Sequence, residues 1–244
     1  MERNIKIEGI TLKKIAIGES NVGVTILTER DEIIFTMAFG ATKPKSKLFE
    51  GVVPFVVSQW DLYHDPVKDH WRCKEVDVKS FNKNIQTSLE GYYTGSLFLE
   101  IVLKSQGSEG SYKILKEALS MLDRGHKTTN VLIQFLLRLL IDQGVLPSFS
   151  CCTKCDKKIG KDLLYVSGNE EFLCSSCYPQ KIGFKINPGI SIYCEKTPYM
   201  SFENSLKVGL EADSLRELKS ILIEFIKKHT EGKLLTLNTA NGLI

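Results

Sequence analysis

The sequence has neither a large excess of charge of one sign nor a long hydrophobic run. Its 32 Lys and Arg side chains are nearly balanced by 29 Asp and Glu side chains, leaving a formal net charge of +3. This balance excludes a global positive field, so a site for a polyanion must come from local clustering. The longest apolar stretch, residues 131–146, contains Gln134, Arg138, Asp142 and Gln143 and is too short and polar to span a bilayer.

Two further absences concern export and catalysis. Residues 1–6 have no apolar segment of the kind that a secretory signal needs, so we expect a soluble cytoplasmic protein. Without export, the seven cysteines argue against a framework of disulfides. The sequence also lacks a P-loop, a G-x-S-x-G nucleophile elbow and an H-E-x-x-H metalloprotease motif. Neither an ATPase nor a metalloprotease is therefore expected.

The composition that remains is that of an ordinary globular protein. Hydrophobic residues make up 43% and charged residues 25% of 244 residues, enough chain for one or two domains with real cores. The first 81 residues contain short segments rich in β-branched and aromatic residues, broken by Gly and Pro. They predict a small five-stranded barrel or curled sheet with strands at residues 5–17, 22–28, 33–39, 52–63 and 71–78.

From residue 82 the apolar spacing changes to that of amphipathic helices. We predict helices from Ile85 to Leu103 and from Tyr112 to Leu122. A third helix is expected after Thr128-Thr129-Asn130, which offers N-cap chemistry, and runs to Gly144. Because it is apolar on most sides, it is typical of the buried centre of a helical domain.

The C-terminal part contains one further clear helix. Residues 181–205 are expected to be irregular, and the helix runs from Leu215 to about His229. Ser214 and Glu217 form a predicted capping box at its start. The sequence thus predicts a barrel at residues 1–81 and a helical domain in two parts, residues 82–150 and 181–244. A cysteine-rich insert, residues 151–180, lies between these two parts.

The insert carries the strongest motif, Cys152-x-x-Cys155 followed after 18 residues by Cys174-x-x-Cys177. Two such pairs, joined by a short hairpin, place four thiolates around one tetrahedral zinc ion. Four cysteine ligands leave no open position, so this zinc would be structural rather than catalytic. Reduced structural thiols or a redox-active Cys-x-x-Cys pair are the alternatives to this interpretation.

The other three cysteines have different expected roles. Cys151 competes with Cys152 for one ligand position, but the two-residue spacing to the next cysteine favours Cys152. Cys73 and Cys194 stand alone, and isolated cysteines most often act as small hydrophobic side chains.

Residues 40–48, Gly-Ala-Thr-Lys-Pro-Lys-Ser-Lys-Leu, form a second motif. Lys43, Lys45 and Lys47 alternate with small residues and suit a phosphate backbone, although a merely solvated loop has the same pattern. Aromatic residues of the predicted strands are expected mainly in the barrel core, with some able to stack on bases: Phe35, Phe39, Phe55, Trp60 and Tyr63.

The order of these parts resembles the bacterial recombination-repair family RecO along most of the chain. The likeness is carried by residues 7–12, 18–20, 24–28, 40–48, 51–55 and 143–147, the last of which lead into Cys152-x-x-Cys155. The resemblance implies an α+β multidomain fold: an N-terminal five-stranded OB-fold barrel, then an all-α helical domain with an inserted four-cysteine zinc finger.

The resemblance also implies a non-enzymatic function. Members of this family bind single- and double-stranded DNA, anneal complementary strands and help RecA to replace single-strand-binding protein (SSB). They work with RecR and contact the acidic, apolar-ended C-terminal tail of SSB, and this activity would place the protein at the nucleoid. By the same resemblance, DNA contacts fall on Lys43, Lys45 and Lys47.

The sequence also offers candidate residues for binding the SSB tail. A peptide carboxylate needs a cation beside an apolar pocket, and Arg124, Lys127 and Arg138 lie near the apolar central helix. A different OB-fold and zinc-finger protein, acting on RNA or in transcription, is one alternative function. A thiol–disulfide oxidoreductase is the other.

Two positions depart from the family pattern. Many relatives have arginines in the basic loop, whereas this chain has Thr42 and lysines only, which contact phosphate without a bidentate fork. Asp156 follows the second cysteine, where glycine is common in zinc knuckles. Asp tolerates a left-handed backbone better than most residues, so zinc binding remains compatible with it.

Overall fold

The computed structural model describes residues 3–67, 69–159, 162–178, 183–240 and 242–244. These form two compact units, Met1–Gly125 with Leu234–Ile244 and His126–Lys233. The predicted end of the insert, residue 180, lies outside the described residues, and the division into four parts with three boundaries stays a prediction. Within the described ranges, no helix is both long and apolar enough to cross a membrane.

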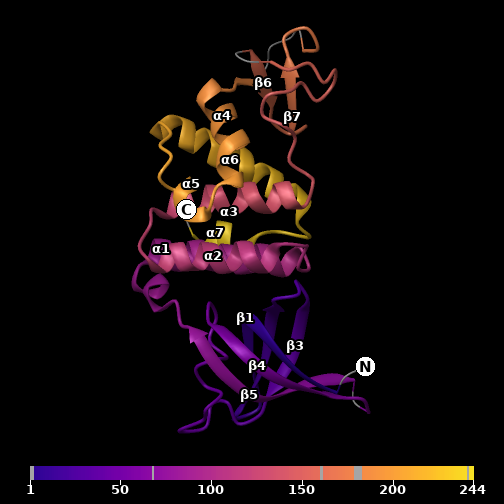
Figure 1. Ribbon diagram of the computed structural model, residues 1–244, viewed down its shortest axis with the longest axis vertical. Coiled ribbons are helices and arrows are strands. Elements are labelled where there is room, and N and C mark those ends of the chain that lie inside the picture. The colour runs from indigo at the N-terminus through magenta and orange to yellow at the C-terminus, as the bar shows by residue number, and fades with distance from the viewer. Residues whose placement is uncertain (1–2, 68, 160–161, 179–182, 241) are drawn as a thin grey trace. The chain divides into compact units, whose positions relative to one another are not determined.

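A closed five-stranded barrel occupies the N-terminal part of the first unit and confirms the predicted OB-fold (Figure 1). Its strand order is β1-β2-β3-β5-β4, in which β3 and β5 are parallel and β1 closes the barrel against β4. A register shift between Thr11 and Lys13 bends β1, so that it pairs first with β4 and then with β2. The strands are β1 (Asn4–Ile17), β2 (Asn21–Thr28), β3 (Ile33–Ala38), β4 (Val57–Asp65) and β5 (His70–Ser80).

The start of β4 differs from the prediction. A strand was expected from residue 52, but β4 begins at Val57. Phe55 has a φ of 74°, outside the range of an extended strand, and its N–H donates to the Thr11 carbonyl at 3.1 Å. The Asn82 side-chain amide donates to the Phe55 carbonyl at 2.8 Å. Long-range hydrogen bonds therefore hold this segment as a turn despite its apolar composition.

Two helices of the first unit, α2 and α7, are capped by carboxylates that are distant in the sequence. The Asp31 carboxylate, in the turn between β2 and β3, accepts the N–H groups of Gly110 at 2.9 Å and Tyr112 at 2.6 Å, at the start of α2. Glu100 likewise accepts the N–H groups of Leu235 at 2.7 Å and Thr236 at 2.9 Å, at the start of α7. Both carboxylates satisfy donors that a helix N-terminus leaves free. The elements are η1 (Lys83–Thr87), α1 (Leu89–Lys104), α2 (Ser111–Asp123) and α7 (Leu235–Thr239).

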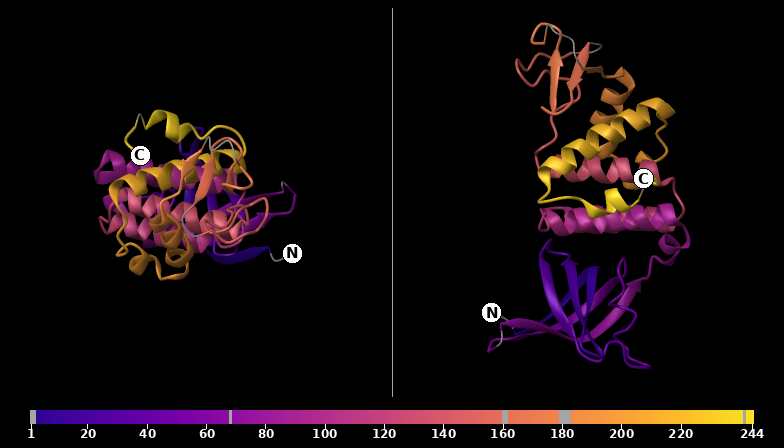
Figure 2. Two further views of the ribbon diagram at one scale, coloured as in Figure 1. Left: turned by 90° about the horizontal axis from the view of Figure 1, so that it is seen from above. Right: turned by 180° about the vertical axis from the view of Figure 1, so that it is seen from behind.

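The second unit is built around α3, which is buried along most of its length and packs against α6 (Figure 2). This confirms the prediction of a buried central helix. A small antiparallel sheet, β7-β6-β8, contains Cys174 as the last residue of β7. The elements are α3 (Thr128–Asp142), β6 (Leu163–Val166), β7 (Glu171–Cys174), β8 (Phe184–Lys185), α4 (Pro188–Lys196), η2 (Thr197–Tyr199), α5 (Phe202–Ser205) and α6 (Ala212–His229).

Three local predictions in this unit are wrong. The start of α3 is at Thr128, so the predicted capping residues lie inside its first turn. The helix α6 begins at Ala212, and the buried Ser214 hydroxyl accepts from the Asn187 amide at 3.1 Å instead of forming a capping box. Residues 181–205 are not irregular throughout, because Asn187 caps α4 through the Gly189 N–H at 2.8 Å.

Candidate functional sites: a cysteine cluster and a basic loop

Four cysteine side chains converge in the second unit. The Sγ atoms of Cys152, Cys155, Cys174 and Cys177 all lie within 4.8 Å of one another, and those of Cys155 and Cys174 are 3.9 Å apart. Four thiolates at the usual zinc–sulfur distance of about 2.3 Å would be about 3.8 Å from one another. The four thiols therefore fit a tetrahedral metal site, which a single redox-active pair would not require.

Local backbone geometry sets up this cluster. The strands β6 and β7 form the predicted hairpin between the two pairs and place Cys174 opposite Leu163. In the first pair, the Asp156 N–H donates to the Cys152 carbonyl at 2.8 Å, and Asp156 has a φ of 56°. Asp156 thus adopts the left-handed conformation that glycine often supplies in zinc knuckles. In the second pair, the Cys177 N–H points to the Cys174 sulfur at 3.4 Å.

The electrostatics of the cluster favour a bound cation. Burial raises the pKa of Cys152, but backbone N–H groups, first that of Cys174 and then those of Lys154 and Cys155, lower it to about 6. The neighbouring thiols of Cys155 and Cys174 raise the pKa of Cys177 to about 12. Cys152 and Cys177 therefore do not both ionise at neutral pH by themselves. A divalent metal ion would supply the positive charge that four thiolates need.

Cys151 lies outside this group. It forms an isolated β-bridge with Lys158, and its sulfur is 3.9 Å from the Ser150 hydroxyl. The structure thus brings Cys152, rather than its neighbour, to the cluster, as the spacing favoured.

We expect a Cys151→Ser protein to keep its full metal content, because the four clustered thiols remain in place. Metal content per chain, measured after purification and dialysis, checks this. The matched variant is Cys152→Ser, in which metal should be lost. Loss of metal from Cys151→Ser, with retention in Cys152→Ser, would contradict the assignment.

The two isolated cysteines are buried, in agreement with their expected role. Cys73 lies in the barrel core, where burial raises the pKa of its thiol to about 12. Burial also raises the pKa of Cys194 well above its ordinary value. Neither thiol is poised to act as a nucleophile, since the thiolate is the reactive form.

The basic loop follows β3 in the first unit, and the side chains of Lys43, Lys45 and Lys47 are all exposed. Its first residues are held by the turn between β1 and β2. The Thr42 N–H donates to the Ser20 carbonyl at 3.2 Å, and the neighbouring Ala41 is buried. The attachment to a fixed turn keeps the three lysines at one end of the barrel.

The far end of the loop is attached as well. The Thr11 hydroxyl donates to the Gly51 carbonyl at 2.7 Å, and Val52 is buried in the barrel core. Between these attachments the chain makes successive turns, and Lys45 has a φ of 63°. The loop is therefore an ordered basic projection, although contact with DNA remains a prediction.

The three candidates for the SSB tail do not form one site that the structure describes. Arg124 follows α2 in the first unit, whereas Lys127 and Arg138 belong to the second. Arg138 donates to the carbonyls of Thr197 at 3.2 Å and Met200 at 2.9 Å, and its guanidinium lies 4.9 Å from the centre of the Phe202 ring. This arginine thus has a structural role in its own unit, and binding of the tail remains a prediction for all three.

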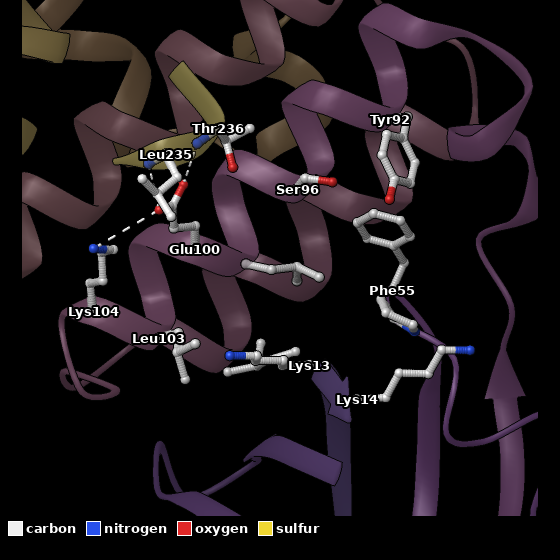
Figure 3. A pocket seen from close by; sticks show the side chains of 13 residues that line it. Lys13, Lys14, Phe55, Tyr92, Ser96, Glu100, Leu103, Lys104, Leu235 and Thr236 are labelled. Atoms are coloured by element: carbon white, nitrogen blue, oxygen red, sulfur yellow. Dashed lines mark hydrogen bonds and ion pairs between the residues drawn. The ribbon is translucent and has the colours of Figure 1, made fainter. Parts of the chain in front are cut away.

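A groove of about 450 Å³ between the barrel and α1 was not predicted from the sequence (Figure 3). Lys13 and Lys14 lie at its edge, and Tyr92 makes an edge-to-face contact with Phe55, with ring centres 5.9 Å apart. Lys13 and Lys14 pair with consecutive residues of β2 and therefore point to opposite faces of β1. Both are exposed, as are Ile15 and Ala16, so neither face of the strand is covered here. Glu100 points to the start of α7 (Figure 3).

Comparison with known proteins matches both parts of the chain. Residues 1–77 match the family model described as "Recombination protein O N terminal", and residues 84–238 match "Recombination protein O C terminal". Relatives named DNA repair protein RecO include those of Acetivibrio thermocellus, 25% identical over 233 residues, and a Thermoanaerobacter species, 24% identical over 251 residues. The first alignment covers 93% of this chain and 92% of the relative, and the second covers 99% of this chain and 98% of the relative. An Exiguobacterium relative is 30% identical over 176 residues, and the alignment covers 70% of this chain and 69% of the relative.

Proposed function

Because the chain belongs to the recombination protein O family, we propose that it is a non-enzymatic DNA repair and recombination protein that anneals complementary single strands. The observation that carries this proposal is that the two family models together account for the barrel, the helices and the cysteine-bearing part. The relatives matched over nearly their whole length are named DNA repair proteins.

Annealing requires no catalytic residue. Two DNA strands repel each other as polyanions, and a basic surface that binds both lowers this repulsion and raises their local concentration. The exposed lysines of the basic loop, Lys43, Lys45 and Lys47, offer such a surface on the barrel. Lys13 and Lys14 add two further cations to the same unit.

The proposed metal is one structural zinc held by Cys152, Cys155, Cys174 and Cys177. The donor set supports this choice, since four thiolates and no oxygen ligand are typical of structural zinc. Bound zinc would stabilise the β6–β7 hairpin by linking its two flanking cysteine pairs. The chemistry of strand pairing itself would not involve the metal.

The proposed partners follow from the family rather than from a site in this chain. We infer that the protein binds single- and double-stranded DNA, cooperates with RecR and contacts the SSB C-terminal tail, so that RecA is loaded onto SSB-coated strands. Arg124, Lys127 and Arg138 remain the candidate cations for the tail carboxylates.

A strand-annealing assay tests the proposal. We expect the protein to accelerate pairing of two complementary DNA oligonucleotides by about tenfold or more, because concentrating both strands on a basic surface raises their encounter rate. Pairing is followed by fluorescence quenching between labelled strands, with and without prior coating by SSB. Complementary RNA strands serve as the comparison, since a protein specialised for RNA would accelerate their pairing instead. No acceleration of DNA pairing by the folded protein would contradict the proposal.

A further inference from the structure

Two phenylalanine side chains are exposed on the outer face of the barrel. Phe35 and Phe39 are 44% and 49% exposed, although Phe55 and Trp60 of the same barrel are buried as predicted. Along β3, residues at alternate positions share one face, so Met37 lies on the same face as Phe35, and Phe39 follows the end of the strand at Ala38. Apolar side chains of this size usually avoid water in a barrel strand, and their exposure together marks a candidate binding surface.

The neighbouring strands leave space over this face. Cross-strand pairing places Gly23 opposite Met37 and Thr25 opposite Phe35. A side chain at Gly23 would meet the Phe35 ring at 2.6 Å and the Ile17 side chain at 2.9 Å. The Phe35 ring and Ile17 therefore lie across the glycine, which has no side chain that would lift them off the sheet. The result is a low apolar platform formed by Ile17, Gly23, Phe35, Met37 and Phe39.

Cations border this platform on several sides. The Arg72 guanidinium lies 5.7 Å from the centre of the Phe39 ring, and it is held by the Asp65 carboxylate at 2.6 Å. Lys13 pairs across β1 and β2 with Thr25, which in turn is opposite Phe35. The basic loop begins immediately after Phe39 and is tied to the turn between β1 and β2. Each of the two rings thus has a cation near it, Arg72 beside Phe39 and Lys13 in the cross-strand row of Phe35.

We propose that Phe35 and Phe39 stack on unpaired bases of single-stranded DNA, while Arg72, Lys13 and the basic loop hold the phosphates. This proposal rests on the proposed function and adds to it the part of the surface that distinguishes single strands from duplex. Phe35 lies within β3 and Phe39 directly follows the last residue of this strand, Ala38. The strand between them alone spans about 10 Å, so the two rings receive different bases. Aromatic faces accept any base, but the faces of paired bases inside a duplex are not available to them.

Charge favours DNA over a protein partner as the occupant of this platform. An apolar protein surface would bury the rings without needing cations at each edge, whereas a single strand presents a phosphate between every two bases. A duplex would engage the lysines but not the rings. The platform therefore predicts two separable contributions to binding, one from stacking and one from charge.

The test compares a Phe35→Leu/Phe39→Leu protein with a Phe35→Tyr/Phe39→Tyr protein. Leucine keeps an apolar surface but has no flat face, whereas tyrosine keeps the ring. The matched control is Phe184→Leu, which changes a 64% exposed phenylalanine on a strand of the second unit. Each protein is titrated at several salt concentrations with an oligonucleotide of about 16 nucleotides, the upper site size of one such barrel, and with its duplex.

We expect the double leucine variant to bind the single strand about tenfold or more weakly, since each stacked base contributes about fivefold or more. Its affinity for duplex and its salt slope should not change, and the tyrosine variant should bind like the original protein. Thermal melting confirms that each variant is folded. Unchanged single-strand affinity in the leucine variant, or an equal loss for single strand and duplex, would overturn the platform. A wild-type protein that binds neither DNA would instead overturn the proposed function.

Discussion

A Cys174→Ser protein is expected to lose the proposed metal, with zinc content falling from the proposed one ion per chain to nearly none. A serine hydroxyl does not ionise near neutral pH, so the site would keep only three thiolates. Cys174 is buried beside Cys152 in the small apolar core of the insert, which leaves little freedom for a replacement ligand to enter. Structural zinc contributes about 10–16 kcal/mol of apparent binding free energy, as large as the whole stability of an average domain.

The loss of metal should also loosen the structure beyond the four cysteines. Phe172 of β7 is completely buried, and its ring centre lies 4.5 Å from that of Phe149 and 6.2 Å from that of Phe225 on α6. In the same region, Glu170 pairs with Lys228 of α6 at 3.3 Å. We therefore expect faster hydrogen exchange in the β6–β7 hairpin and in the C-terminal half of α6.

The first unit provides the internal control for this experiment. Its barrel has a separate apolar core, so hydrogen exchange in β1 to β5 should stay unchanged in the Cys174→Ser protein. Full zinc occupancy in this variant would show that Cys174 is not a ligand. Fast exchange across both units would show that the metal stabilises more of the chain than its own unit.

Patterns of neighbouring residues predicted the barrel and the cysteine cluster. Segments rich in β-branched and aromatic residues, bounded by Gly and Pro, identified the strands, and two Cys-x-x-Cys pairs need only a hairpin between them to meet. The start of β4 could not be predicted in this way, because Phe55 is held in a turn by a hydrogen bond that it donates to Thr11 and one that it accepts from Asn82. The start of α6 was missed for a similar reason, since Ser214 bonds to Asn187 rather than to its own helix.

The candidate binding surfaces depend even more on long-range structure. The sequence shows three lysines in a loop, but not that Thr42 attaches this loop to the turn after β1. The exposure of Phe35 and Phe39 follows from the strand register and from the bare surface at Gly23, neither of which is visible from composition. The helix α4 is a different case. Asn187 and Pro188 are an N-cap and a first-turn proline, a local signal that was available in the sequence.

Replacing Lys43, Lys45 and Lys47 together with alanine is expected to weaken DNA binding and reduce its dependence on salt. Each lysine that neutralises a phosphate releases condensed counterions, and for single strands this contributes roughly 0.7 to the salt slope. Three engaged lysines would therefore account for about two units of slope. The affinity for different base sequences should fall almost equally, since phosphate contacts carry no sequence information.

The salt dependence of DNA affinity distinguishes contacts made by the loop lysines from stacking on the aromatic platform and from a general effect of net charge. A variant with Lys196, Lys207 and Lys227 changed to alanine also removes three exposed positive charges, but from the second unit. It should keep the original slope if the loop lysines make the contacts.

Thermal stability should change by no more than about 0.5 kcal/mol in the loop variant, because exposed side chains contribute little to folding. Annealing should slow along with binding, because both depend on the same phosphate contacts. An unchanged slope in the folded loop variant would mean that these lysines are only solvated and that DNA follows another path across the protein.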